Sequence, residues 1–289
     1  MLLTILQRAG QRSITKKHPA QNISGAAIEK IWLKCNKSEL GFAIFWIVVY
    51  ILFASIADSV SLTIGVEKCI TSITLVAMSV FILLWIIRNN HINKYGLCKP
   101  KHNSKYYLYY IPLIIMISIN LCLGFALNYS IIETVLFIIS MLCVGFLEEI
   151  IFRGFLFKAM AKDNLLSAII VSSVTFGIGH IINLFSGGGE SLVASICQVF
   201  YAMVAGFLFV VIFYRGGSLI LCIITHSLFN ALSCFMNYAR LTPLIDIIIS
   251  IVLIVLNVGY ALVLLKILPK ENIDNAEEDK VHINNNMVE

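Results

Sequence analysis

The sequence carries little charge for its length. Only 13% of its 289 residues are Asp, Glu, Lys or Arg, and 59% are hydrophobic, whereas soluble globular domains carry about a quarter charged residues. Apolar runs long enough to cross a bilayer recur along the chain, so the composition excludes a soluble domain and predicts an all-α, polytopic membrane protein. The net charge is +5, but the cations stand at the ends of apolar runs, which argues against a nucleic-acid partner.

Paired cysteines and internal repeats are also lacking. The eight cysteines are scattered singly and form no C-x-x-C pair. This spacing excludes a disulfide framework and a zinc ribbon, and the cysteines are interpreted as small hydrophobic residues. No repeat relates one half of the chain to the other, although many transporters are built from repeated halves.

What the chain does have is a series of apolar segments flanked by basic residues. Eight spanning helices are predicted, approximately at 40–58, 69–87, 107–128, 131–161, 164–185, 191–214, 217–237 and 243–266. The cations cluster before the first span and after the second, fourth, sixth and eighth, so all clusters fall on one side if both termini are cytoplasmic. The connections on the other side ("SVSLTIGVE", "NYSI", "SGGGES", "NYARLT") contain one cation, Arg240.

This pattern divides the chain into three parts. Residues 1–38 form a basic cytoplasmic segment, residues 39–267 a transmembrane bundle, and residues 268–289 a polar, acidic tail that is predicted to be disordered. The expected location is therefore a cell membrane, crossed many times, with the lipid bilayer as the surroundings of the bundle. The abundance of Ile, Asn and Lys favours an AT-rich bacterial genome as the source.

One stretch breaks the rule that spans avoid charge. "GFLEEIIFRGFLF", residues 145–157, contains two glutamates and an arginine, and each ionised group at bilayer depth costs about 2.5–3.5 kcal/mol on insertion scales. On a helix Glu149 and Arg153 are i,i+4 and share a face, whereas Glu148 points about 100° away. Glu149 is therefore predicted to pair with Arg153, leaving Glu148 free to face a cavity.

Two later spans carry further polar side chains. "SVTFGIGHIINLF" places His180 in the fifth span, and "LCIITHSLFNAL" places His226 and Asn230 four residues apart in the seventh. Counted from the cytoplasmic ends at about 1.5 Å per residue, Glu148 and both histidines reach depths that agree within about two turns. Three helices are therefore predicted to bring carboxylates, imidazoles and a carboxamide to one chamber. Gln198 and Asn257 are interpreted as interhelical hydrogen-bonders.

These residues resemble the motifs of the CPBP (CAAX protease and bacteriocin-processing) family of intramembrane proteases, which includes the CAAX prenyl endopeptidases. The three motifs, each on its own helix and in the family's order, are Glu-Glu-x-x-x-Arg at Glu148, Glu149 and Arg153, Phe-x-x-x-His at Phe176 and His180, and His-x-x-x-Asn at His226 and Asn230. The resemblance spans a protease core of about 107–237. It implies hydrolysis of a peptide bond within the membrane.

The resemblance also implies a role for each residue. Glu148 suits a general base acting on water, and Asn230, together with His226, could donate hydrogen bonds to an oxyanion. The histidines either orient that water or, in the metalloprotease interpretation usual for the family, bind Zn²⁺ together with a glutamate, which would make His180, His226 and Glu149 the ligands. Arg153 orients Glu149, and Phe176 shapes the chamber.

Peptides or membrane-protein segments are the expected substrates, and the site would open toward the cytoplasm or the lipid plane. Two alternatives remain: a transporter or ion pathway that uses the buried charges for binding, and a membrane scaffold or immunity-type protein that has the same fold without catalysis. The aspartyl and serine classes of intramembrane protease find no support, because there is no Gly-x-Gly-Asp motif and "GGSLI" has Ile220 where a nucleophile elbow needs glycine.

Overall fold

A computed structural model describes residues 38–181 and 192–269 of the chain. Within these ranges the protein is all-helical, and it has five helices long and apolar enough to span a membrane. They are α3 (Glu39–Ile64), α4 (Cys69–Arg88), a continuous helix at Ile131–Ala161, α9 (Leu192–Gly216) and α11 (Pro243–Ile267). The predicted class, a polytopic helix bundle in a membrane, is confirmed. The predicted N-terminal segment and acidic tail lie outside the described residues, apart from their first or last few positions.

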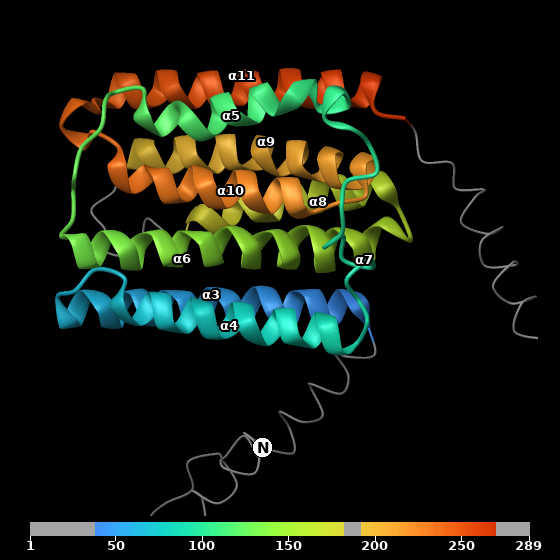
Figure 1. The fold of residues 1–289 in the computed structure, drawn as a ribbon, viewed down its shortest axis with the longest axis horizontal. Helices are drawn as coiled ribbons and strands as arrows, with labels where there is room; N and C mark the ends of the chain where they lie inside the picture. The colour runs from blue at the N-terminus through green and yellow to red at the C-terminus, as the bar shows by residue number, and fades with distance from the viewer. Residues whose placement is uncertain (1–37, 182–191, 270–289) are drawn as a thin grey trace, which may run out of the picture.

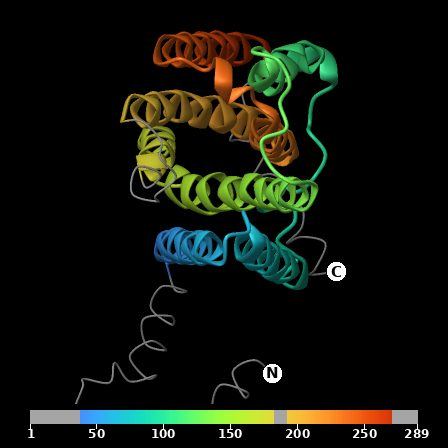
Figure 2. The same cartoon turned by 90° about the vertical axis from the view of Figure 1, so that its left-hand side faces the viewer.

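The bundle is layered (Figures 1 and 2). The α3–α4 pair packs against the helix at Ile131–Ala161, which consists of α6 (Ile131–Glu149), the π-helix η3 (Ile150–Phe157) and α7 (Lys158–Ala161). Two shorter helices, α8 (Leu165–Gly179) and α10 (Ile220–Leu232), lie next to it together with α9. α11 and the short α5 (Ile111–Ser118) form the next layer, with α11 packed on α9 and α5 packed on α10.

Local sequence signals explain where several helices begin and end. Ser130 and Glu133 form a capping box at the start of α6, so that each side chain accepts a hydrogen bond from a backbone N–H of the other residue. Asn164 caps α8 through Ser167 N, and Thr242 caps α11 ahead of Pro243. Gly65 ends α3 with φ of 79°, a conformation that glycine adopts without strain. The long apolar runs are thus divided by ordinary helix-capping chemistry.

The third predicted span, 107–128, is wrong as a continuous membrane helix. Its α-helical part is only Ile111–Ser118, preceded by the 3₁₀ segment η1 (Ser104–Tyr110) and followed by η2 (Ile119–Leu121). Polar side chains hold the remainder to the end of α10, because Asn120 donates to Phe229 O at 2.6 Å and Asn128 donates to Cys234 O at 2.8 Å. These hydrogen bonds to another part of the chain cannot be inferred from the hydropathy of the segment.

The fifth and seventh predicted spans are also shorter than expected. α8 ends at Gly179, so His180 is its C-cap residue and not an interior one, and residues 182–185 of the prediction lie outside the described part of the chain. α10 ends at Leu232 and continues as a 3₁₀ turn, η5 (Ser233–Phe235). Both short helices lie against longer ones, α8 on α9 and α10 on α6.

The predicted basic clusters that fall within the described residues gather at one end of the bundle, the end at which α4, α7, α9 and α11 finish (Figure 1). The cluster predicted before the first span lies outside the described residues. Glu39, at the start of α3, pairs with Lys94 at 2.9 Å and with Lys162 at 2.6 Å. Arg215 donates to Leu268 O at 3.2 Å. At the opposite end Lys68, which directly follows the connection "SVSLTIGVE", pairs with Asp58 at 2.9 Å, so Arg240 is not the only cation there.

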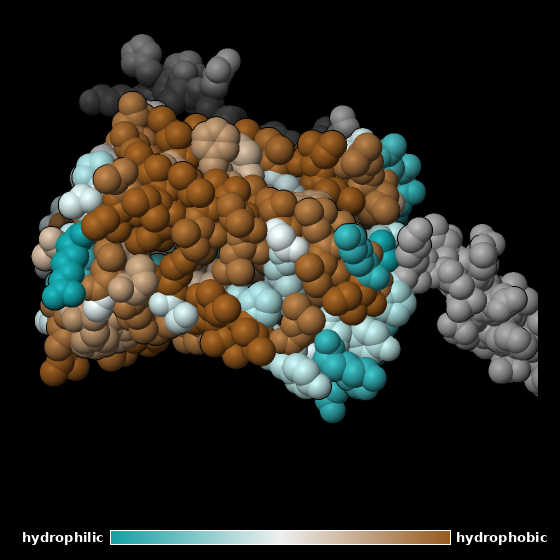
Figure 3. Space-filling model, turned by 90° about the horizontal axis from the view of Figure 1, so that it is seen from above, coloured by the Kyte–Doolittle hydropathy of each residue, from teal (hydrophilic) through white to brown (hydrophobic). Residues whose placement is uncertain are grey.

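The outer surface fits a lipid environment. Seen from the side of α5 and α11, apolar side chains cover most of the face, and the polar ones gather mainly toward its ends (Figure 3). Large apolar side chains such as Leu244, Val255 and Ile131 are well exposed. A water-soluble monomer rarely exposes apolar patches of this extent, so the chain is a multi-pass membrane protein.

Candidate active site

The site begins on α6 and η3, at the charged stretch. Glu149 and Arg153 form the ion pair expected from their spacing, with Arg153 Nη1 2.9 Å from Glu149 Oε1, and neither side chain is exposed. The backbone between them is a π-helix, which the sequence analysis did not anticipate. π-Helical turns are rare and often lie at functional sites. A wider turn still leaves residues four apart nearly on one face, so the pair forms.

Two aromatic rings line the guanidinium of Arg153. Its central carbon lies 4.1 Å from the centroid of the Phe176 ring and 5.5 Å from that of Phe209. Arg153 Nε and Nη2 have no hydrogen-bond partner within the described residues, so the π faces and Glu149 carry the stabilisation of this buried cation. Removing one partner of such a buried pair typically costs about 3–5 kcal/mol, because the other charge is then left uncompensated.

His226 links the two glutamates. Its Nδ1 lies 2.9 Å from Glu149 Oε1, and its Nε2 lies 3.6 Å from Glu148 Oε2. Glu149 paired with Arg153 acts only as an acceptor, so the hydrogen of the shorter contact belongs to His226 Nδ1. The Nε2 atom is therefore directed at Glu148 at a distance too long for a direct hydrogen bond.

A glycine allows α10 to approach α6 closely enough for these contacts. A Cβ at Gly145 would lie 2.5 Å from the backbone nitrogen of Ser227 and 2.6 Å from its Cα. Ser227 Oγ, in turn, donates to Leu142 O at 3.1 Å. Gly145 lies three residues before Glu148, and Ser227 directly follows His226, so this close contact between α6 and α10 also positions the candidate site.

Glu148 has a partner that no motif indicates. The hydroxyl of Tyr50, from α3, donates to Glu148 Oε1 at 2.7 Å, while Glu148 Oε2 has no hydrogen-bond partner within the described residues. Glu148 is therefore held by one oxygen, and the other oxygen is buried and makes no hydrogen bond to the described residues. Tyr50 was not predicted, because a single tyrosine in an apolar span resembles ordinary packing.

The Phe176 ring packs against the imidazole rings of both histidines. Its ring centroid lies 5.3 Å from that of His180 and 5.6 Å from that of His226, and both imidazole rings stand nearly perpendicular to it, at 87° and 86°. The two histidines therefore contact the same phenyl ring, although they come from α8 and α10. His226 is buried, whereas His180 is partly exposed at the end of α8.

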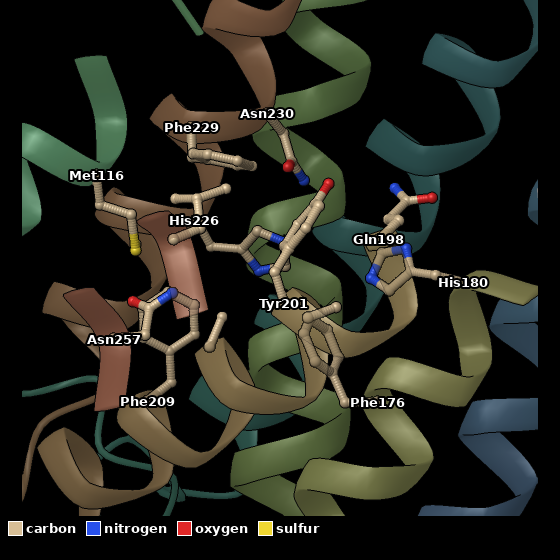
Figure 4. Close-up of a pocket in the computed structure, with 13 residues that line it drawn as sticks. Met116, Phe176, His180, Gln198, Tyr201, Phe209, His226, Phe229, Asn230 and Asn257 are labelled. Atoms are coloured by element: carbon tan, nitrogen blue, oxygen red, sulfur yellow. The ribbon is translucent and has the colours of Figure 1, made fainter. Parts of the chain in front are cut away.

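A cavity of about 450 Å³, counting its open mouth, lies beside the histidines. His180, His226 and Asn230 all line it, together with Gln198 and Tyr201 of α9 (Figure 4). The carboxylates of Glu148 and Glu149 are not among its lining groups; they lie behind His226, which contacts both the carboxylates and the cavity. Five helices contribute to the wall: α5, α8, α9, α10 and α11.

The predicted residues thus fall into two connected groups. Glu148, Glu149 and Arg153 form a buried charge cluster with His226, and His180 and Asn230 share the cavity with the same histidine. Tyr50 and Phe209 are additions that the sequence did not indicate. Asn257, interpreted from the sequence as an interhelical hydrogen-bonder, has a side-chain oxygen without a partner in the described structure; this interpretation is wrong.

A zinc ion at this site would need the side chains of His180, His226 and Glu149 to converge on one point. Among residues 38–181 and 192–269, no group of three His, Cys, Asp or Glu side chains is placed to hold a metal ion. Glu149 Oε1, a candidate ligand atom, is already bonded to Arg153 and to His226 Nδ1. The three residues named as ligands do not fit a zinc site in this arrangement, because zinc sites need at least three convergent protein ligands.

One protein-family model matches the part of the chain that carries the motif residues. Residues 130–232 match the family model described as type II CAAX prenyl endopeptidase Rce1-like. The matched segment runs from the cap of α6 to the end of α10, and it contains all seven motif residues. No curated protein and no solved structure matches the chain significantly. The resemblance to the CPBP family is confirmed over this segment, and a match to an endopeptidase family indicates a peptidase.

Proposed function

We propose that this chain, which carries the Rce1-like segment at residues 130–232, is an intramembrane endopeptidase that hydrolyses a peptide bond with a water molecule activated by Glu148. The observation that carries the proposal is the position of His226 between the two glutamates. Glu149 contacts Arg153 and His226 Nδ1 through Oε1, whereas Glu148 is held by Tyr50 and directs Oε2 toward His226 Nε2, 3.6 Å away. Within the described residues Oε2 of each glutamate makes no hydrogen bond, but only that of Glu148 lies opposite an imidazole nitrogen.

Glu148 and His226 can bind one water molecule together. Two polar atoms 3.6 Å apart can each lie within hydrogen-bond distance of a water that sits to one side of the line between them. Glu148 then removes a proton from this water as the new oxygen bonds to the carbonyl carbon of the substrate. The glutamic acid so formed returns the proton to the leaving nitrogen as the C–N bond breaks, so Glu148 ends in its original state.

Glu149 and Arg153 orient His226 for this role. His226 Nδ1 lies 2.9 Å from Glu149 Oε1, and Arg153 Nη1 holds the same oxygen at 2.9 Å. With its hydrogen on Nδ1, the imidazole accepts a hydrogen bond from the water through Nε2 and so orients the water for attack.

The cavity supplies the remaining groups. The Asn230 carboxamide lies one helical turn after His226 and lines the same cavity, so it is placed to donate to the carbonyl oxygen as that oxygen becomes negative. Oxyanion donors of this kind are typically worth about 3–4 kcal/mol. His180, on the other side of Phe176, is proposed to bind the water or the substrate carbonyl from the mouth of the cavity. The substrates are peptides or membrane-protein segments that reach the site from the cytoplasm or from the lipid plane.

The test compares peptides released in cell membranes that contain the wild-type protein with those released in membranes that contain Glu148→Gln. The wild type should yield specific cleavage products, and the variant should yield none while it remains folded and in the membrane. Equal products from both proteins would exclude Glu148 as the base. In a chelator arm of the same experiment, unchanged cleavage would agree with the unsuitable metal geometry, and loss of cleavage that Zn²⁺ restores would favour the metalloprotease interpretation.

The chain offers a matched control on the same helix. Glu133 lies in the first turn of α6, where its carboxylate caps Ser130, and glutamine also serves at that position of a capping box. Glu133→Gln should therefore leave the cleavage products unchanged. A loss of cleavage in both variants would indicate a general effect of glutamine on α6 and not a catalytic role for Glu148.

A further inference from the structure

The wall of the cavity formed by α5 and α11 lies outside the matched segment 130–232. It contributes Met116 from α5 and Leu253 and Asn257 from α11. In Figure 4, Met116 and Asn257 lie on one side of His226, and His180 and Gln198 lie on the other. His180, His226 and Asn230 of the proposed function therefore line one part of the cavity, with Glu148 behind His226, and a separate set of side chains from α5 and α11 lines another part.

Asn257 is the unusual member of this wall. Only 1% of the residue is exposed, and its side-chain oxygen has no hydrogen-bond partner within the described residues. Burying an amide oxygen without a hydrogen-bond partner is unfavourable, because the contacts it made with water are lost. Leu253 lies one turn earlier on the same helix face, and Met116 is likewise buried; both line the same cavity as Asn257.

We infer that Asn257, Met116 and Leu253 form a substrate-binding subsite that recognises one residue of an extended peptide next to the scissile bond. A carboxamide donates and accepts hydrogen bonds, as a backbone peptide group does, so Asn257 can satisfy the N–H and C=O of a substrate residue. Met116 and Leu253 then contact the side chain of that residue, which is aliphatic. Methionine adapts its shape to its neighbour, which suits a subsite that accepts several aliphatic side chains.

The inference rests on the proposed function and names the binding of its substrate. Asn257 acts in the complex with substrate, because in the free protein its buried amide oxygen has no hydrogen-bond partner among the described residues. If Asn257 instead held two helices together, its replacement would weaken the fold. A stability measurement therefore separates the two roles without any substrate.

Asn257→Leu keeps the volume of the side chain and removes the amide. Since no protein hydrogen bond is lost, its melting temperature in detergent should equal or exceed that of the wild type. Asn120→Leu is the matched control, because Asn120 is also a buried asparagine, in η2 directly after α5, but donates to Phe229 O at 2.6 Å. That variant should melt at a lower temperature. A melting temperature for Asn257→Leu lowered as much as that of Asn120→Leu would overturn the inference.

The functional arm uses purified protein in lipid vesicles and a proteome-derived peptide library, with cleavage positions read by mass spectrometry. The wild type should prefer an aliphatic residue at one fixed position relative to the cut. For a peptide cleaved by the wild type, Asn257→Leu should raise KM about tenfold with little change in kcat, because it removes a hydrogen bond made to the bound substrate. Met116→Ala should shift the preferred side chain at that position to a larger one.

The outcomes distinguish the two proposals. If the wild type cleaves no more than Glu148→Gln, the proposed function fails and the subsite fails with it. If the wild type cleaves and Asn257→Leu has the same KM and the same sequence preference, the proposed function stands and the subsite is refuted. A change confined to kcat would also refute it, because that result would place Asn257 among the groups that act on the transition state.

Discussion

At the scale of single residues, the most informative contact is the one between Tyr50 and Glu148. The phenol donates to Oε1 at 2.7 Å and leaves Oε2 facing His226, so Tyr50 is a positioning residue for the proposed base. Tyr50→Phe should lower kcat about 10- to 100-fold, the usual worth of a hydrogen bond to a charged group, with little effect on KM. The measurement is steady-state cleavage of a library peptide that the wild type cleaves.

The control for this variant is a tyrosine whose hydroxyl is buried elsewhere. Tyr260 donates to Tyr107 O at 2.9 Å, between α11 and η1, far along the chain from the motif residues. Tyr260→Phe should leave kcat unchanged and affect stability alone. If both variants lose activity equally, or if Tyr50→Phe changes KM instead of kcat, the positioning role is refuted.

The sequence indicated the charged and polar residues of the candidate site, but not the aromatic residues that contact them. Glu148, Glu149, Arg153 and His226 were predicted because charged and polar groups in an apolar run are costly and stand out. Tyr50 and Phe209 could not be found in this way, because aromatic side chains in membrane helices usually only pack. These two belong to the candidate site through contacts with residues about a hundred or about fifty positions away, and a single sequence does not encode that pairing in any local pattern.

At the scale of helices, the close approach of α6 and α10 determines whether the site forms. Gly145→Ala would place a Cβ 2.5 Å from the backbone nitrogen of Ser227, and a backbone atom cannot rotate away as a side chain can. We expect the variant to be destabilised by about 1–3 kcal/mol, as in other overpacked cores. Activity should be lost even in the folded fraction, because His226 moves away from Glu148. Thermal unfolding in detergent and cleavage per folded molecule are the measurements.

Gly259→Ala is the matched helix variant. Gly259 lies inside α11, and a Cβ there meets no atom within 4 Å. Alanine is favoured over glycine in helices by about 1 kcal/mol, so this variant should melt at the same temperature as the wild type or higher and retain full activity. Equal stability and activity of Gly145→Ala and Gly259→Ala would show that the contact between α6 and α10 does not position the site.

Helix boundaries were predicted well where length and capping agreed, and poorly where tertiary contacts interrupted an apolar run. α4 and α11 lie within a residue of their predicted bounds. The span at 107–128 is interrupted because Asn120 and Asn128 donate to backbone carbonyls at the end of α10. Hydropathy reports only that these residues are mostly apolar. The π-helix of η3 was likewise not predictable, because hydrophobic periodicity over eight residues does not separate it from an α-helix.

At the scale of the whole molecule, the orientation in the membrane remains a prediction. The basic residues at the ends of α4, α7 and α9 lie at one end of the bundle, and the positive-inside rule assigns that end to the cytoplasm. Labelling of single cysteines in a variant whose eight native cysteines are replaced by alanine tests the assignment. Lys99→Cys reports on the basic end, and Leu127→Cys, well exposed between η2 and α6, reports on the other.

A membrane-impermeant maleimide added to intact cells should label Leu127→Cys and should label Lys99→Cys only after the membrane is made permeable. The opposite pattern would invert the topology and place the shared end of the basic clusters outside the cell. This result also bears on substrate access, because Glu148 lies thirteen residues from the basic end of the helix at Ile131–Ala161, a rise of about 20 Å. With the basic end in the cytoplasm, a substrate segment from that side must enter the bilayer to this depth, whereas a segment already in the lipid reaches the carboxylate laterally.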